Sequence, residues 1–213
     1  MKTPAGGGSG DNRIADPLAW AMSSRAADGA ESGDLSWVVP RADGVLLAVV
    51  DGLGHGHRAA LAARAAGQVL RAHADLEMTE LVEKCHRALR KTRGVAMTLV
   101  WIAPGRSRMT WLGVGTVRAI LWRPDNAAVP ACERLVLFRG VVGHQLPSMS
   151  PTTVPLLGSE TVVLATDGVD PAFTEDPVSA EDPGGAADRI LATYATGTDD
   201  ALVLVASYRH GAR

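Results

Sequence analysis

The sequence predicts one α/β domain that is rich in antiparallel strand pairs, with helices covering the sheets. Continuous apolar runs such as those at 44–50 and 201–208 have the length and composition of buried strands. Two helical segments follow the first run, and a middle region of short strands with tight links comes after them. This order of strands, two helices, more strands, one helix and a last strand fits helices packed on largely antiparallel sheets.

The first half of the chain contains three expected strands and two expected helices. The strands are expected at 18–25, 35–39 and 44–50. The alanine-rich segment 56–74 has high helix propensity. In the segment 77–92, Leu81, Cys85 and Leu89 recur on one helical face, and basic residues lie toward its carboxyl end, where they suit the helix dipole.

The second half contains mostly strands. They are expected at 95–103, 108–115, 117–124, 133–140, 161–168 and 201–208, with one helix at 186–195. The segment 140–155 contains prolines and has no strand period, so we expect a surface loop there.

Composition limits the classes of protein to consider. The 213 residues are 46% hydrophobic and 21% charged, with a net charge of -2, so neither a nucleic acid nor a membrane surface is an expected partner. No apolar run reaches the roughly 18 residues of a membrane helix. Residues 1–16 form a glycine-rich stretch without the apolar core of a secretion signal, and we expect a flexible tail before a single domain at 17–213. Two cysteines without paired spacing suit the cytoplasm.

The segment VVDGLGHGHRAA at 49–60 allows two interpretations. Glycines between a strand and a helix are typical of a dinucleotide loop. However, the spacing is GxGxG, His57 stands where a third glycine is needed, and no further strand–helix–strand unit follows. The alternative is that the strand ends by presenting Asp51 to a metal ion.

Four sites at strand edges favour the metal interpretation. Asp51-Gly52 and Asp167-Gly168 each end an apolar strand, while Asp34 and the pair at 199–200 each precede one. Clustered carboxylates repel one another and call for a cation, and oxygen ligands suit Mg²⁺ or Mn²⁺. The glycines would let the backbone approach an ion or a phosphate. Asp-Gly is also a common turn dipeptide, so solvated strand ends are the competing explanation.

The motifs ESGD, DGLGHG, ATDGV and GTDDA, in this order, resemble those of the PPM family of metal-dependent protein phosphatases, also called type 2C phosphatases. The resemblance extends from Asp34 to Tyr208 and is strongest to the SpoIIE-like branch, including its short stand-alone stress-signalling members. It implies a four-layer αββα sandwich of two mainly antiparallel sheets, with two Mn²⁺ or Mg²⁺ ions at one end.

The resemblance also implies roles for particular residues. Asp51 would bridge both ions, the Gly52 carbonyl would bind one, and Asp167 and Asp199 would hold the other. Asp34 would contribute directly or through water. A water activated by the ions would attack phosphoserine or phosphothreonine, so no side chain is needed as nucleophile. The implied partner is a phosphorylated regulator of bacterial stress signalling, such as a STAS-domain or anti-sigma antagonist protein.

Some positions depart from the family pattern. Leu53 stands where the main branch has a histidine that is a proposed general acid, and His55 lies two positions further on. His55 could contact substrate, but a role in capping the following helix is favoured. Arg25 and Arg58 are the candidates for binding the substrate phosphate. A catalytically silent regulatory module of the same fold is the alternative function. The sequence does not indicate the oligomeric state.

Overall fold

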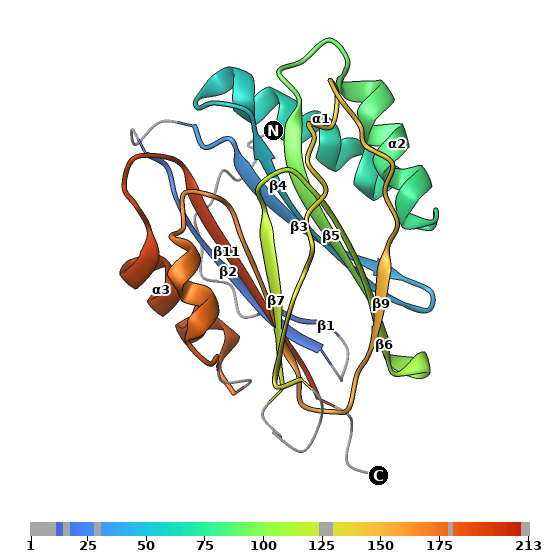
Figure 1. Cartoon of the computed structure of the whole chain (residues 1–213), viewed down its shortest axis with the longest axis vertical. Helices are drawn as coiled ribbons and strands as arrows, with labels where there is room; N and C mark the ends of the chain where they lie inside the picture. The colour runs from blue at the N-terminus through green and yellow to red at the C-terminus, as the bar shows by residue number, and fades with distance from the viewer. Residues whose placement is uncertain (1–11, 15–17, 28–30, 124–129, 179–180, 210–213) are drawn as a thin grey trace.

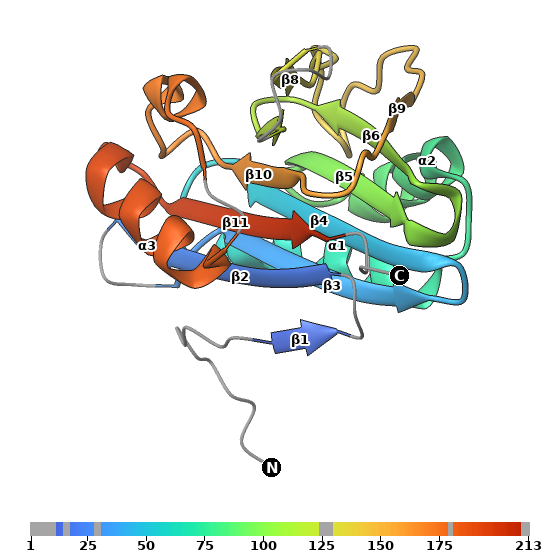
Figure 2. The ribbon, with the colours of Figure 1, turned by 90° about the horizontal axis from the view of Figure 1, so that it is seen from below.

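The computed structural model describes residues 12–14, 18–27, 31–123, 130–178 and 181–209, and within them eleven strands form two sheets (Figures 1 and 2). Every pair of neighbouring strands is antiparallel. The six-stranded sheet has the order β1 (Asn12–Ile14), β2 (Leu18–Arg25), β11 (Ala201–Tyr208), β10 (Thr161–Ala165), β7 (Arg118–Trp122), β8 (Cys132–Arg134). The five-stranded sheet has the order β3 (Asp34–Arg41), β4 (Gly44–Gly52), β5 (Val95–Ala103), β6 (Arg108–Val114), β9 (Thr152–Pro155).

Helices cover the outer face of each sheet. α1 (His57–Ala72) and α2 (Met78–Leu89) pack on the five-stranded sheet, and α3 (Pro183–Tyr194) packs on the six-stranded sheet (Figure 1). Short 3₁₀ turns occur at Pro104–Arg106 and Pro171–Glu175. The four-layer αββα sandwich is therefore confirmed.

The side-chain alternation of β4 shows how the layers form. Val45, Leu47 and Val49 belong to the core between the two sheets. Leu46, Ala48 and Val50 belong to the core beneath the helices. Because successive side chains of a strand point to opposite faces, a strand buried on both sides must be apolar throughout. Burial on both faces therefore explains the continuous apolar run that predicted this strand.

The small residues of α1 let this helix lie close to the sheet. Its buried face consists of alanines, Gly67 and Leu70. A Cβ atom on Gly67 would lie 2.0 Å from the ring of Trp37 on β3, so only glycine leaves room for the indole. The alanines predicted the helix through their propensity, and they also fix how closely the helix approaches the sheet.

Two segments differ from the expectations. The segment 133–140 was expected to be a strand, but β8 ends at Arg134. The chain then crosses from the six-stranded sheet to the five-stranded one, where the side chains of Leu135 and Leu137 lie against Gly113. The segment therefore contacts both sheets and continues neither, which its apolar sequence could not reveal.

The segment 140–155 is not a simple surface loop. Its end forms β9, which pairs with β6. Val142 is fully buried and forms a bridge with Val95.

At the other end of the chain, residues 12–14 form β1 and pair with β2, so the sheet begins before the predicted domain start at 17. The rest of the predicted tail lies outside the described residues. In the described part of the chain, no helix has the length and apolar character needed to cross a membrane.

Candidate functional site

Asp34 and Asp51 are brought together by the pairing of β3 with β4. Asp34 begins β3, Asp51 is the penultimate residue of β4, and the two are register partners across the antiparallel ladder. Directly opposed residues of such a ladder project from the same face of the sheet. The first two predicted ligands, 17 positions apart in the sequence, therefore lie side by side at the end of the sheet.

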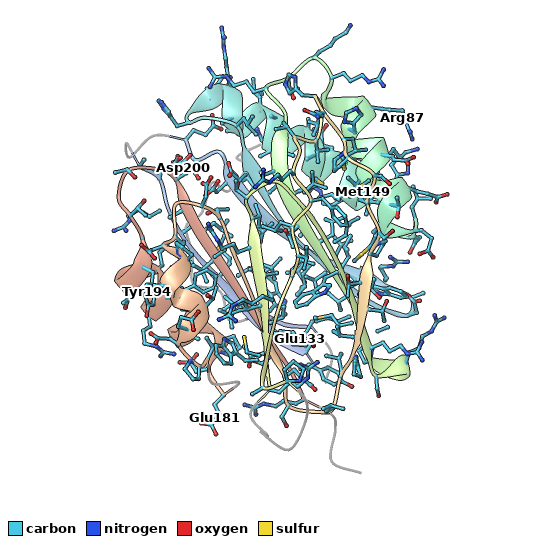
Figure 3. All side chains as sticks on the ribbon, viewed as in Figure 1. Arg87, Glu133, Met149, Glu181, Tyr194 and Asp200 are labelled. Atoms are coloured by element: carbon cyan, nitrogen blue, oxygen red, sulfur yellow. The ribbon has the colours of Figure 1, made fainter. Side chains whose placement is uncertain are left out.

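The second sheet supplies the remaining carboxylates. Asp167 follows β10, while Asp199 and Asp200 precede β11, which is the antiparallel neighbour of β10. Asp200 lies where β11 begins, at the upper end of the view in Figure 3. The Thr166 amide donates to the Leu202 carbonyl at 3.1 Å and extends this pairing to the loops. The ends of both sheets thus present acids to the same place.

Gly52 and Gly168 follow the two aspartates because the chain packs against itself there. A Cβ atom on Gly52 would lie 2.2 Å from the Ala59 carbonyl oxygen, and one on Gly168 would lie 2.0 Å from the Asp200 carbonyl oxygen. The structure thus gives a packing reason for both glycines, and their expected approach to an ion or a phosphate stays a prediction. The two glycines hold the acidic loops close together.

The carboxylates interact electrostatically across the two sheets. Burial, followed by the charge of Asp51, raises the pKa of Asp34 to about 8, although a hydrogen bond from Thr166 lowers it in part. Burial, followed by the charges of Asp167 and Asp199, raises the pKa of Asp51 to about 7. Each shift records a carboxylate that is costly to ionise among like charges.

Two residues that the sequence did not assign to the site support it. Asp200 is buried, and its Oδ1 and Oδ2 accept hydrogen bonds from the amides of Ala27 at 2.9 Å and Gly33 at 2.7 Å. It thereby fixes the segment that leads into Asp34. Thr116, between β6 and β7, donates its hydroxyl to Asp51 Oδ2 at 3.3 Å. The paired acid at 199–200 was visible in the sequence, whereas nothing marked Thr116.

The donor set is chemically suited to a hard divalent cation. It consists of oxygen atoms, and the buried Oδ2 of Asp34 has no hydrogen-bond partner. None of the ion pairs that join described residues includes any of the five acids. Within the described residues, however, no three His, Cys, Asp or Glu side chains converge closely enough to hold a metal ion as they stand. The two sheets therefore bring the predicted acids close enough to interact electrostatically. As they stand, the acids do not form a complete coordination sphere.

The histidine and arginine candidates lie around this end. Gly56, not His55, occupies the N-cap position of α1, so His55 does not have the capping role that was favoured. Arg25 ends β2 opposite Ala201, and Arg58 is in the first turn of α1. Arg93, which the sequence did not single out, places Nη1 2.7 Å from where a Cβ on Gly54 would stand. Arg93 thus lies close to the loop that follows Asp51.

The topology excludes the dinucleotide interpretation of the glycine-rich loop. β4 lies between β3 and β5, and both pairings are antiparallel, whereas a dinucleotide fold needs parallel strands joined by the helix. Gly54 and Gly56 have φ angles of 78° and 72°, so both residues adopt the left-handed conformation that glycine allows. They shape the turn from β4 into α1.

Comparison with known proteins agrees with this arrangement. The family described as stage II sporulation protein E (SpoIIE) matches residues 41–209, which is most of the chain. The chain belongs to the SpoIIE family. The phosphoserine phosphatase RsbX of Bacillus subtilis is 30% identical over 82 residues, a match that covers 38% of this chain and 41% of RsbX.

Solved structures of SpoIIE-type and related phosphatases share the fold. The structure of RsbX in complex with magnesium has a TM-score of 0.79 at 20% identity, covering 92% of this chain and 98% of that one. The serine/threonine phosphatase PstP of Mycobacterium tuberculosis has a TM-score of 0.70 at 18% identity, covering 91% of this chain and 99% of that one. At these identities the likeness establishes the αββα sandwich.

Proposed function

We propose that this SpoIIE-family chain is a metal-dependent protein phosphatase that hydrolyses phosphoserine or phosphothreonine. The observation that carries the proposal is the meeting of acids from two separate sheets at one end of the sandwich, where burial and like charge raise the pKa of Asp34 and Asp51. A protein does not gain stability from such a cluster by itself, and perturbed carboxylates are typical of functional sites.

The residues that would hold two Mn²⁺ or Mg²⁺ ions are Asp34, Asp51, the Gly52 carbonyl, Asp167 and Asp199. Bound ions of this kind lower the pKa of a water and offset the charge that develops on the phosphoryl oxygens. Asp51 is central among the acids, because its pKa responds to Asp167 and Asp199 as well as to burial. Thr116 and Asp200 would orient Asp51 and the segment before Asp34 through their hydrogen bonds.

No cysteine competes with water as the attacking group. Burial raises the pKa of the Cys85 thiol to about 12, and burial is also the main cause of the raised pKa of Cys132. A thiolate is the reactive form, so both thiols are poor nucleophiles at neutral pH. Both cysteines are free, which agrees with the expectation of a cytoplasmic location.

The proposed substrate is a phosphorylated regulatory protein in bacterial stress signalling. The support is the partial match to RsbX and the fold shared with a solved stressosome protein, which has a TM-score of 0.79. A STAS-domain or anti-sigma antagonist protein fits this proposal. The candidate ligands stand at the rim of the sandwich, where Asp167 and Asp199 are exposed, so a phosphorylated side chain on a large partner can reach them.

The test is phosphate release from a phosphoserine peptide with Mn²⁺, with Mg²⁺ and with excess chelator. We expect activity only with metal, and its loss in Asp51→Asn but not in Asp188→Asn, which changes an exposed acid on α3. Activity that persists in excess chelator would contradict the mechanism. Inactivity under every metal condition, with a folded protein that still binds phosphoprotein, would favour the silent regulatory module.

A further inference from the structure

A cavity lies at the opposite end of the five-stranded sheet from the candidate metal site. Its volume is about 420 Å³, and its polar lining includes Arg41, Trp101, Arg106, Arg108, Thr110 and Thr153. The β3–β4 turn beside it is seven residue steps along β4 from Asp51, which is about 24 Å at the rise of an extended strand. Figure 1 shows this light-blue turn at the lower right, far from the start of β11. The cavity is therefore separate from the cluster of aspartates.

Three arginines line the cavity. Arg41 stacks on the Trp101 ring at 4.8 Å, and the Arg106 guanidinium lies 6.0 Å from the same ring. Arg106 and Arg108 are exposed, and neither forms an ion pair with an acid in the described part of the chain. Glu77 is the one acid in the lining, and Asp43 and Asp75 pair with Arg41, so Arg106 and Arg108 supply the positive charge that no ion pair among the described residues neutralises.

Unused hydrogen-bond donors accompany this charge. The Arg41 side chain is only 10% exposed, and its Nε forms ion pairs with Asp43 at 3.8 Å and Asp75 at 3.9 Å but no hydrogen bond. Its Nη2 donates to the Asp75 carbonyl at 3.3 Å. Trp101 Nε1 is also buried without a partner. Buried donors without acceptors are costly, and an anion supplies acceptors.

The N-terminus of α2 opens into the same cavity. Met78, the first residue of the helix, and Glu77 at the N-cap both belong to the lining, and the Glu77 side chain makes no capping hydrogen bond. The first amides of a helix have no partner within it, and the helix dipole favours negative charge there. Free amides, guanidinium groups and threonine hydroxyls together make a surface complementary to a tetrahedral oxyanion.

We infer that this cavity is a second binding site of the protein and that it takes a phosphate-bearing group. Phosphate carries negative charge that can pair with the guanidinium groups of Arg106 and Arg108, and it has enough oxygen atoms to reach arginines from β3 and from the 3₁₀ turn before β6. The cavity is larger than one phosphate, so the ligand extends beyond it. It is either a small phosphorylated molecule or a phosphorylated side chain of a partner. The site does not depend on the proposed catalysis.

The test is a titration of the whole protein in excess chelator, so that no divalent ion holds phosphate at the aspartates. Inorganic phosphate, adenosine monophosphate and a phosphoserine peptide are compared by calorimetry and by amide chemical shifts. We expect saturable binding that shifts the amides of residues 78–80. Tighter binding of adenosine monophosphate would identify a small-molecule ligand, and tighter binding of the peptide a partner's side chain.

Arg106→Gln and Arg108→Gln change exposed side chains and should leave the fold intact, as unchanged thermal unfolding would verify. Each should weaken binding by about tenfold, the effect of losing one charge-assisted hydrogen bond. Arg87→Gln is the matched control, because it removes an exposed arginine from the other end of α2. The inference is overturned if none of the three probes binds saturably, or if the Arg106 and Arg108 variants bind as tightly as the control.

Discussion

Replacing Asp51 by asparagine should stabilise the metal-free protein, and the gain should be larger at pH 8 than at pH 5. Burial, Asp167 and Asp199 raise the pKa of Asp51 from 3.8 to about 7. The folded protein therefore holds this proton more tightly than the unfolded chain does. The resulting stability is fully present below a pH of about 3.8 and is lost as the pH rises through about 7. Asparagine has no proton to lose and escapes this loss.

The pKa values set the size of the effect. A difference of about three pKa units corresponds to an upper limit of about 4 kcal/mol at pH 8. Because the Asp51 side chain is partly exposed to water, we expect a gain of about 2 kcal/mol in the free energy of unfolding. At pH 5 the wild type has lost only part of the stability that the proton on Asp51 provides. The gain from Asp51→Asn at pH 5 should therefore be less than half of the gain at pH 8.

The measurement is urea unfolding in excess chelator at both pH values for wild type, Asp51→Asn and Asp188→Asn. Saturating Mg²⁺ should reverse the order of stability, because the wild type gains more from binding the ion. A variant that is less stable than wild type at pH 8 in chelator would show that Asp51 is a structural residue. An equal gain at both pH values would show that its ionisation is not the cause.

Three further variants test the architecture of the site. Gly168→Ala should abolish most phosphatase activity, since its Cβ would meet the Asp200 carbonyl oxygen at 2.0 Å, whereas Gly105→Ala, with open space around it, should not. Asp200→Ala should lower the free energy of unfolding by about 1–3 kcal/mol and weaken Mg²⁺ binding measured by calorimetry, because two backbone amides lose a charged acceptor. Thr116→Val should raise the apparent pKa of Asp51, followed by carboxyl NMR, because the hydroxyl now lowers it.

Most of the fold could be predicted from local patterns. The strand expected at 95–103 and the strand expected at 18–25 have those bounds in the structure, and the first two helices end within three residues of their predicted limits. The two segments whose structure was predicted wrongly have one cause in common. The strand predicted at 133–140 and the loop predicted at 140–155 lie where the chain moves between sheets or joins a sheet edge. An apolar residue in these segments packs against parts of the chain that are distant in the sequence. The local pattern of apolar residues therefore does not identify its packing partners.

The candidate site, like the fold, has a part that the sequence predicts and a part that it does not. The sequence alone predicted that the aspartates stand at the ends of the sheets, because an acid that directly follows or precedes a buried apolar strand lies where the strand ends. It also identified the family through the order of these motifs. It could not show that Asp34 and Asp51 are register partners, because strand pairing depends on backbone hydrogen bonds between distant residues.

Tertiary structure alone decided what the remaining residues do. Gly52 and Gly168 turned out to accommodate the chain's own backbone, and Asp200 turned out to brace the segment before Asp34. The arginine-lined cavity is formed by residues of β3, β5, β6 and the start of α2, and no sequence motif predicted it. Local sequence determines which residues reach the end of a strand or helix, since that depends on near neighbours. Which ends meet depends on how the layers pack, and that is a property of the whole chain.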